Sequence, residues 1–263
     1  FGQLHKDNPA DIRGLVGVVE TLAGQNRMED AVAELRRAVA AEPKRRDLQI
    51  ALANLLVRSE KYDEAVSIYK SIIAKEPKAA DILFKLAETF RRKGDLNLAI
   101  ENFRAASQAA PTDTNSLMQL ALLLDGTGRR DQAKPVYEQI LKLDNNHGVA
   151  LNNLAYIKAE EGVDLDSALN MAQKARQNMP NSNDVTDTLG WIYIKKNMTE
   201  EAVHTFSDLV RKAPADPNYH YHYGKALLQK GDKQSARREL EASLKSNPSK
   251  DVASAVQDLL KSI

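Results

Sequence analysis

The sequence of 263 residues contains no cysteine and no long apolar run. The lack of cysteine excludes disulfides, zinc–thiolate sites and thiol nucleophiles. A helix needs roughly 18 consecutive apolar residues to cross a bilayer, and no stretch approaches that length, so we expect no membrane span. Residues 1–6 also lack a charged segment followed by an apolar one, which predicts that a signal peptide is either absent or was removed before this chain begins.

The chain also has no excess of charge of either sign. Lysine and arginine number 37 and aspartate and glutamate number 36, which gives a formal net charge of +1. The two signs are balanced along the chain as well, so no basic or acidic block is hidden in the total. Because binding to DNA or RNA normally requires a basic patch, we expect no nucleic-acid partner.

The most informative feature that is present is the spacing of the prolines. They recur every 34 residues in two series, Pro9, Pro43, Pro77 and Pro111, then Pro180, Pro214 and Pro248. Asn145 takes the intermediate place, 34 residues after one series and 35 before the next. Each proline follows a stretch with helical periodicity, as expected of a residue that cannot continue a helix. Such a strict period predicts a repeat architecture.

Each period also repeats a pattern of small and large residues. Twelve positions before the proline or its substitute stands a small residue, at Ala31, Ala65, Ala99, Ala133, Ala168, Ala202 and Ala236. Four positions later stands a mostly large apolar residue, at Leu35, Tyr69, Phe103, Tyr137, Ala172, Phe206 and Leu240. Small residues let two helix backbones approach closely, and large ones fill the grooves between them. Each period therefore predicts a hairpin of two helices, A and B.

A tight turn is predicted between helices A and B. Six of the seven units place there a residue that tolerates the left-handed conformation, namely Asn26, Gly94, Gly128, Gly162, Asn197 and Gly231. Glu60 is the exception, and its turn is expected to be strained or differently shaped. Acidic or hydroxyl residues just after the turn, such as Asp63, Asp95 and Thr199, are expected to cap helix B.

Together these features resemble tetratricopeptide repeats. The resemblance covers residues 12–250 and implies an all-α fold, a right-handed α-solenoid (superhelix) of stacked antiparallel helix pairs. The seven units expected are 12–45, 46–79, 80–113, 114–147, 148–182, 183–216 and 217–250. The fifth unit carries one extra residue within 163–167, which is expected to alter its A–B turn but not its stacking.

The two ends of the chain do not form complete units. Phe1 and Leu4 fall where a helix B would place its large and small residues, so residues 1–11 are expected to be the tail of a truncated upstream unit. At the other end, residues 251–263 have the apolar spacing of one amphipathic helix. A solenoid needs its terminal unit covered, so this segment is expected to be a capping helix.

The resemblance implies a non-catalytic scaffold for protein–protein interaction, without a cofactor, that binds a peptide or a helix of a partner in the concave groove of the A helices. The A-helix positions that avoid the packing face are expected to line this groove. The predicted partner-binding set is Asn152, Asn153, Tyr156, Asp187, Thr188, Trp191, Tyr221, His222 and Lys225. A secondary groove set is Asn54, Lys85, Glu88, Arg92, Met118 and Gln119. Aromatic residues beside polar ones are typical of binding hot spots, but Trp191 and Tyr156 have the alternative role of filling gaps between adjacent A helices.

Catalytic and metal sites are not expected. His220 and His222 lie two positions apart on a predicted helix and point to different sides, so they cannot chelate one ion together. The glycine-rich run at Gly126 and Gly128 is explained by the A–B turn, and it lacks the third glycine and the preceding strand of a phosphate loop. The lysine and asparagine set with which some tetratricopeptide proteins grip chaperone tails is also absent, with Asn152 where a lysine is required.

Residues 151–156 and 187–193 further resemble bacterial tetratricopeptide proteins of the cell envelope, including ones associated with exopolysaccharide export and outer-membrane assembly. The likeness implies a soluble bacterial protein, periplasmic or cytoplasmic with the periplasm favoured, acting in an envelope or export assembly. The alternative is a non-catalytic array of a larger enzyme, such as a glycosyltransferase, that recruits its substrate. Self-association through the open N-terminal end is a third expectation, because an open solenoid end exposes apolar surface.

Overall fold

The computed structural model describes residues 12–263, and all the regular structure in this part of the chain is α-helical. The predicted upstream tail, residues 1–11, and the self-association expected through it lie outside the described residues. The helices are α2 (Ile12–Gly24), α3 (Met28–Ala41), α4 (Arg46–Arg58), α5 (Tyr62–Ile73), α6 (Ala80–Lys93), α7 (Leu96–Ala109), α8 (Thr114–Gly126), α9 (Arg130–Leu143), α10 (Gly148–Glu161), α11 (Leu165–Asn178), α12 (Asn183–Lys195), α13 (Thr199–Lys212), α14 (Pro217–Lys230), α15 (Lys233–Lys245) and α16 (Lys250–Lys261). Over residues 12–263, no helix is both long enough and apolar enough to cross a bilayer.

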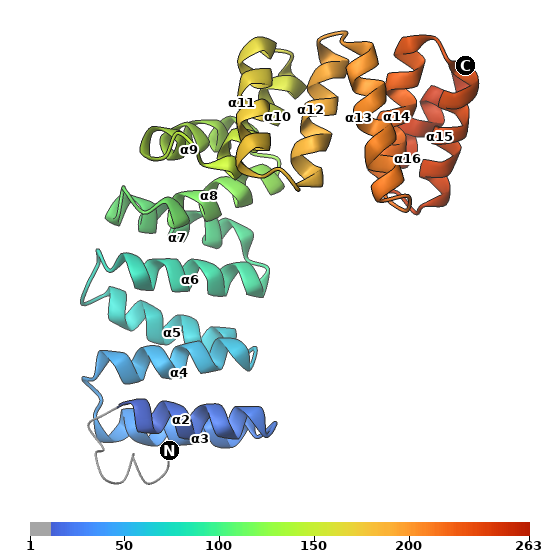
Figure 1. The fold of residues 1–263 in the computed structure, drawn as a ribbon. Helices are drawn as coiled ribbons and strands as arrows, with labels where there is room; N and C mark the ends of the chain where they lie inside the picture. Colours follow the sequence, from blue (N-terminus) through green and yellow to red (C-terminus); the bar gives the residue numbers. More distant parts are fainter. Residues whose placement is uncertain (1–11) are drawn as a thin grey trace. The chain divides into compact units, whose positions relative to one another are not determined.

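The chain divides into two compact units, residues 1–128 and 129–263, which we call the N-terminal and the C-terminal unit. The division falls between α8 and α9, the two helices predicted over 114–147. Within each unit, consecutive helices pack against each other as antiparallel pairs (Figure 1). In the C-terminal unit the A helices α10, α12 and α14 also contact one another, and α16 packs on α14 and α15. The predicted all-α class with stacked helix pairs is therefore confirmed within each unit.

The close approach of helices A and B follows from the small and large residues that the repeat pattern places between them. The alanine of each helix B within 12–263 is fully buried, as Ala202 and Ala236 illustrate. A Cβ added to Gly190 would lie 2.5 Å from Cζ of Phe206, and one added to Gly224 would lie 2.7 Å from Cδ2 of Leu240. Each fully buried Phe or Leu side chain stabilises the fold by roughly 1.5–3 kcal/mol, so these contacts are the main source of cohesion within a pair.

The A–B turns share one backbone conformation. Gly94, Gly128, Gly162 and Gly231 have positive φ, as do Asn26 and Asn197. Glu60 adopts the same left-handed conformation, with φ +59°. Of the two alternatives expected for this turn, the structure supports strain: the shape is the same as in the other turns, and the left-handed conformation of Glu60 costs about 1–2 kcal/mol because its Cβ crowds the following carbonyl.

The extra residue of the fifth unit lies in the turn between α10 and α11. Three residues separate these helices, whereas two separate α6 from α7 and α14 from α15, which also turn at a left-handed glycine. The longer turn closes because Asp164 joins Gly162 at positive φ. The two helices still pack together, as expected.

None of the three caps of helix B that were named makes a side-chain capping hydrogen bond. Asp63 lies inside the first turn of α5, Thr199 is the first residue of α13, and Asp95 occupies the N-cap position of α7 without such a bond. The expected acidic cap of a helix B is present at Asp232, whose side chain accepts from the N–H of Ser235 in α15. Other side-chain caps lie before A helices, at Asp113, Ser182 and Asp216. The tight A–B turn holds the start of helix B through backbone hydrogen bonds, such as the one from the N–H of Asp95 to the carbonyl of Phe90.

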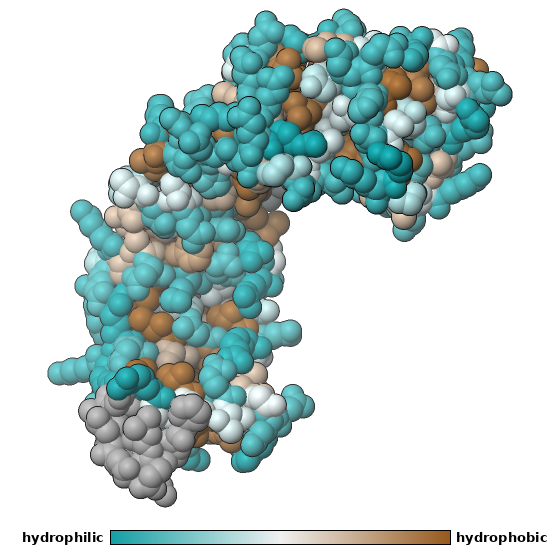
Figure 2. Space-filling view, in the orientation of Figure 1, coloured by the Kyte–Doolittle hydropathy of each residue, from teal (hydrophilic) through white to brown (hydrophobic). Residues whose placement is uncertain are grey.

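The apolar faces of the helices are turned inward in both units. On the face that Figure 2 shows, hydrophilic side chains cover most of the described surface and apolar ones appear mainly between helices. The helix expected over 251–263 is α16, which buries Val256 completely against its neighbours. Its other apolar side chains, Val252, Leu259 and Leu260 among them, remain partly exposed.

Gly190→Ala tests the close packing directly. Alanine normally favours a helix over glycine by about 1 kcal/mol, but here its Cβ would collide with the Phe206 ring. We expect a net loss of up to about 2 kcal/mol in the free energy of unfolding, because overpacking costs about 1–3 kcal/mol and the helix preference of alanine returns about 1 kcal/mol. Urea denaturation followed by far-UV circular dichroism measures it. Gly126→Ala is the matched control, because its Cβ would meet nothing within 4 Å. Equal behaviour of the two variants would contradict the packing account.

Candidate functional site

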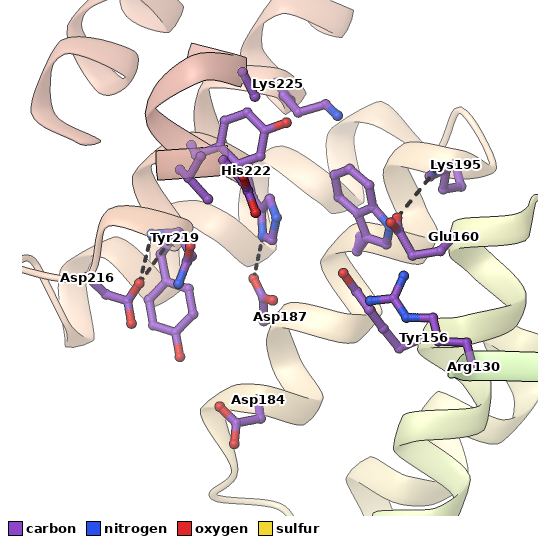
Figure 3. Close-up of a pocket in the computed structure, with 16 residues that line it drawn as sticks. Arg130, Tyr156, Glu160, Asp184, Asp187, Lys195, Asp216, Tyr219, His222 and Lys225 are labelled. Atoms are coloured by element: carbon purple, nitrogen blue, oxygen red, sulfur yellow. Dashed lines mark hydrogen bonds and ion pairs between the residues drawn. The ribbon is translucent and has the colours of Figure 1, made fainter. Parts of the chain in front are cut away.

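The most extensive cavity described lies in the C-terminal unit, where the A helices contact one another. It has a volume of about 800 Å³ and is lined from α10, α12, α14 and α16, with Arg130 at the start of α9 (Figure 3). We call it the A-helix pocket. Its lining residues are Arg130, Tyr156, Glu160, Asp184, Asp187, Trp191, Lys195, Asp216, Asn218, Tyr219, Tyr221, His222, Lys225, Asp251, Val252 and Ala255.

Trp191 forms the floor of the A-helix pocket. Its side chain is only 6% exposed, and its Nε1 donates a 2.6 Å hydrogen bond to Oε1 of Glu160 on α10. Its ring lies 4.8 Å from the ring of His222 on α14. Trp191 thus fills the space between neighbouring A helices, and this is the alternative role that was expected for it from the sequence. It also lines the cavity.

His222 connects this floor to α12. Its Nδ1 lies 2.7 Å from Oδ1 of Asp187, and both side chains are largely buried. The rings of Phe206 and Tyr221 lie 5.4 Å and 5.3 Å from the imidazole ring. The aspartate and these rings fix the orientation of the imidazole.

Lys225 and Lys195 place two cations beside the tryptophan. The Nζ atom of Lys225 is 4.3 Å from the Trp191 ring centroid and 5.3 Å from that of Tyr221. Lys195 Nζ lies 5.1 Å from the same Trp191 centroid and 3.8 Å from Oε1 of Glu160. The pKa of Lys225 is lowered, first because burial disfavours its charged form and second because Lys195 repels it. Contact with an aromatic face offsets part of that cost.

Tyr156 stands on α10 at the same end of the pocket. The guanidinium of Arg130 lies 5.6 Å from its ring centroid. Burial, and then the carboxylate of Glu160, raise the pKa of Tyr156, while Arg130 opposes them. The phenol is therefore uncharged at neutral pH and offers a flat, partly buried surface with a polar tip.

Acidic residues gather at the opposite end of the pocket. Asp184 lies in the first turn of α12, Asp216 caps α14, and Asp251 lies in the first turn of α16. Burial, and then Asp187, Asp216 and Asp184, raise the pKa of Tyr219 to about 12. The nearby carboxylates thus disfavour further negative charge at this end.

A second cavity of about 400 Å³ adjoins the A-helix pocket and shares Tyr156, Asp184 and Asp187 with it. Its lining includes Asn152, Asn153 and Thr188. Nδ2 of Asn153 donates to the hydroxyl of Tyr137, and Oδ1 of Asn153 accepts from Nδ2 of Asn152. These bonds hold the two amides between α9 and α10.

The N-terminal unit has its own smaller cavity, of about 280 Å³. Four residues of the predicted secondary groove line it: Asn54, Lys85, Glu88 and Arg92. Asn54 Oδ1 accepts a 2.7 Å hydrogen bond from the hydroxyl of Tyr69. Met118 is only 8% exposed and Gln119 is partly buried, so both have little surface on α8 to offer.

The structure thus brings together the nine residues of the predicted partner-binding set. Tyr156, Asp187, Trp191, Tyr221, His222 and Lys225 line the A-helix pocket, and Asn152, Asn153 and Thr188 line its neighbour. The prediction did not include Glu160, Lys195 and Asp184, although each lies three or four positions from a predicted residue on the same helix face. It also missed the contribution of α16, because that helix was interpreted only as a cap.

His220 and His222 point to different elements. The Nδ1 atom of His220 lies 2.7 Å from Oε2 of Glu239 on α15 and its Nε2 atom lies 3.0 Å from the carbonyl of Pro214, whereas His222 faces Asp187 on α12. No group of three potential metal ligands occurs in residues 12–263.

Two family models described as tetratricopeptide repeat match the chain. One matches residues 50–114 and 188–251 and the other residues 114–147, together more than half of the sequence. No curated protein matches.

Solved structures of tetratricopeptide proteins have the same fold. A tetratricopeptide repeat protein from Parabacteroides merdae is 18% identical with a TM-score of 0.62, over 95% of this chain and 97% of that one. YrrB, described as a TPR protein with an unusual peptide-binding site, is 16% identical with a TM-score of 0.56, over 72% and 97% of the two chains. MamA from Desulfovibrio magneticus is 20% identical with a TM-score of 0.57, over 65% and 97%. At these identities the likeness shows the fold alone.

Trp191→Phe tests the packing of the pocket floor. The variant keeps an aromatic ring but loses the indole N–H that donates to Glu160. Because a hydrogen bond to a charged group contributes about 1.5–3 kcal/mol, we expect a loss of that size in urea denaturation followed by circular dichroism. Tyr221→Phe removes one polar atom from the pocket wall and should change stability by less than about 0.5 kcal/mol. If the two variants were equally stable, Trp191 would not be part of the packed floor.

Proposed function

The chain belongs to the tetratricopeptide repeat family, and from that premise we propose that it is a non-catalytic scaffold whose C-terminal unit receives a segment of a partner protein in the A-helix pocket. The contact residues in this proposal are Asn152, Asn153, Tyr156, Asp187, Thr188, Trp191, Tyr221, His222 and Lys225. The cavity of the N-terminal unit, with Asn54, Lys85, Glu88 and Arg92, is proposed as a secondary site.

The observation that carries the proposal is the convergence of aromatic and charged side chains from five helices on one cavity of about 800 Å³. Tryptophan and tyrosine are enriched among the residues that dominate binding energy, above all where they lie in a pocket surrounded by polar groups. Tyr156 and Tyr221 are partly exposed and available for contact, while Trp191 supports them from below. YrrB, which shares the fold, is described as having a peptide-binding site, and this is consistent with the proposal.

Binding accounts for this chemistry better than catalysis does. The His222–Asp187 pair resembles the base and orienting acid of a nucleophilic site. However, the lining of the A-helix pocket, as far as the structure describes it, includes no serine, threonine or cysteine to activate. The imidazole also packs against Trp191, Phe206 and Tyr221, so its contacts serve to position the wall of the pocket.

We further propose that this binding takes place within a bacterial envelope or export assembly. The support is the sequence of residues 151–156 and 187–193, which resembles envelope tetratricopeptide proteins. The alternative, an array that recruits the substrate of a larger enzyme, uses the same pocket. The full-length gene distinguishes them, since an encoded catalytic domain would favour the alternative and a lipoprotein signal the assembly.

The double variant Tyr156→Ala/Tyr221→Ala tests the proposed function. We expect it to lose at least about tenfold in affinity for a captured partner, because hot-spot truncations cost about 2 kcal/mol or more, while its helical content stays unchanged. Trp191 is left intact because its burial would let a loss of folding imitate a loss of binding.

His204→Ala is the control, because its side chain is 81% exposed on α13 and does not line the A-helix pocket. The partner is isolated by affinity capture from cells that produce the protein, and its affinity for each variant is measured by calorimetry. A partner that binds the double variant as tightly as the unaltered protein would contradict the proposal.

A further inference from the structure

We propose that the segment received by the A-helix pocket is extended and bipolar, with a basic side chain at the end formed by Asp184, Asp216 and Asp251 and an acidic group at the end formed by Lys195 and Lys225. The inference rests on the proposed function and adds the chemistry of the partner to it.

Apart from Glu160 at the C-terminal end of α10, the charges at the two ends of the pocket are sorted along the direction of the A helices. On α12, Asp184 lies in the first turn and Lys195 is the last residue. On α14, Asp216 caps the first turn and Lys225 follows nine positions later. Figure 3 shows Asp184 and Asp216 on one side of the pocket and Lys195 with Arg130 on the other. The two ends of the cavity therefore attract opposite charges.

The positions of the acids alone do not require a ligand. Acidic side chains at helix N-termini are stabilised by the helix dipole, which explains the presence of Asp184, Asp216 and Asp251. The same explanation does not extend to Lys225. It lies in the middle of α14, whose last turn already has Lys230, so the dipole gives it little stabilisation.

Lys225 is a partly buried cation with no carboxylate in direct contact, although the charge of Glu160 acts on it from a distance. Among residues 12–263 no carboxylate oxygen lies within 4 Å of its Nζ, whose described neighbours include two aromatic faces. Glu160 is within reach of Lys195 and is already bonded to Trp191. The pKa of Lys225 is lowered, because burial and then Lys195 disfavour its charged form by more than Glu160 favours it. An acidic group of a bound segment would supply the missing counter-charge in a desolvated place, where such a pair is strongest.

The distance between the two ends fits a short extended segment. Asp184 and Lys195 are eleven positions apart on one helix, which at 1.5 Å per residue is about 16 Å. An extended chain covers this distance in about five residues. A helix would need about eleven residues to cover the same distance, so the spacing of the partner's charges tells an extended segment from a helix. The basic and acidic residues of the partner are therefore expected four to six positions apart.

The middle of the pocket gives the segment its remaining character. Between the charged ends lie the rings of Trp191, His222 and Tyr221. These flat faces favour an aromatic or apolar side chain between the two charges.

Selection from a random linear peptide library on the intact protein tests the inference. Enriched peptides are synthesised and titrated while the fluorescence of Trp191 is recorded, since this is the only tryptophan of the chain and it forms the pocket floor. We expect enriched peptides to carry Lys or Arg and Asp or Glu four to six positions apart. Lys225→Met and Asp251→Asn should each weaken binding about tenfold, the effect of losing one charge-assisted hydrogen bond.

Matched controls separate the pocket from the rest of the surface. Lys245→Met on α15 and Asp258→Asn on α16 remove the same charges outside the pocket lining and should leave affinity unchanged. Asp184→Lys tests whether Asp184 contacts the peptide, because a residue that only stabilised the fold would not reverse the charge preferred in the peptide. Because Asp184 is exposed, the variant should fold normally and should prefer a peptide in which the basic residue is replaced by glutamate.

The outcomes distinguish the two proposals. Enriched peptides that need Tyr156 and Tyr221 but ignore the charge variants would overturn the bipolar segment and leave the proposed function standing. Failure to enrich any peptide whose binding depends on Tyr156 and Tyr221 would overturn the proposed function, and the inference with it. Enriched peptides with a basic and an acidic residue four to six positions apart, together with the reversed preference of Asp184→Lys, would support both proposals.

Discussion

The whole structure depends on the close approach of two helix backbones within each pair. Gly190 against Phe206 and Gly224 against Leu240 show how little room the interface leaves, since an added Cβ would come within 3 Å of the facing side chain. One helix pair has too little apolar surface to be stable alone, and neighbouring pairs must cover it. In the C-terminal unit this requirement brings α10, α12 and α14 side by side. The A-helix pocket is therefore a consequence of the packing.

The same packing determines which chemistry the pocket can have. All three A helices run in the same direction within the unit, because each is followed by an antiparallel helix B. Their N-terminal ends gather Asp184 and Asp216, and Lys195 lies at the other end of α12. Ordinary helix electrostatics thus produces a cavity with one acidic end. Lys225 departs from that pattern, and such a departure from local preference is typical of positions retained for binding.

Much of the fold and of the candidate site was predictable from the sequence, because each repeat period places the same kinds of residue at the contacts between helices. The alanines twelve positions before each proline and the turn glycines identify the helix pairs, and the A-helix faces follow from helical geometry.

The sequence did not predict which side chains contact one another across different helices. The burial of Trp191 depends on the gap between α10 and α14, and its bond to Glu160 joins residues 31 positions apart. Asp251 and Val252 line the pocket because α16 packs on α14. The spacing of apolar residues within one helix does not predict such a contact between helices. The capping prediction for Asp63 and Thr199 was wrong because α5 begins at Tyr62 and α13 at Thr199, so both residues lie inside the helix.

The proposed function requires the A-helix pocket to be the surface that contacts the partner. Site-specific photo-cross-linking measures this most directly, with a benzoylphenylalanine residue replacing Tyr221 in one protein and His204 in another. The account predicts a cross-linked product with the captured partner from position 221, through a segment that carries both a basic and an acidic residue, and none from position 204. Cross-linking from position 204 with none from position 221 would place the contact on α13 and would contradict it.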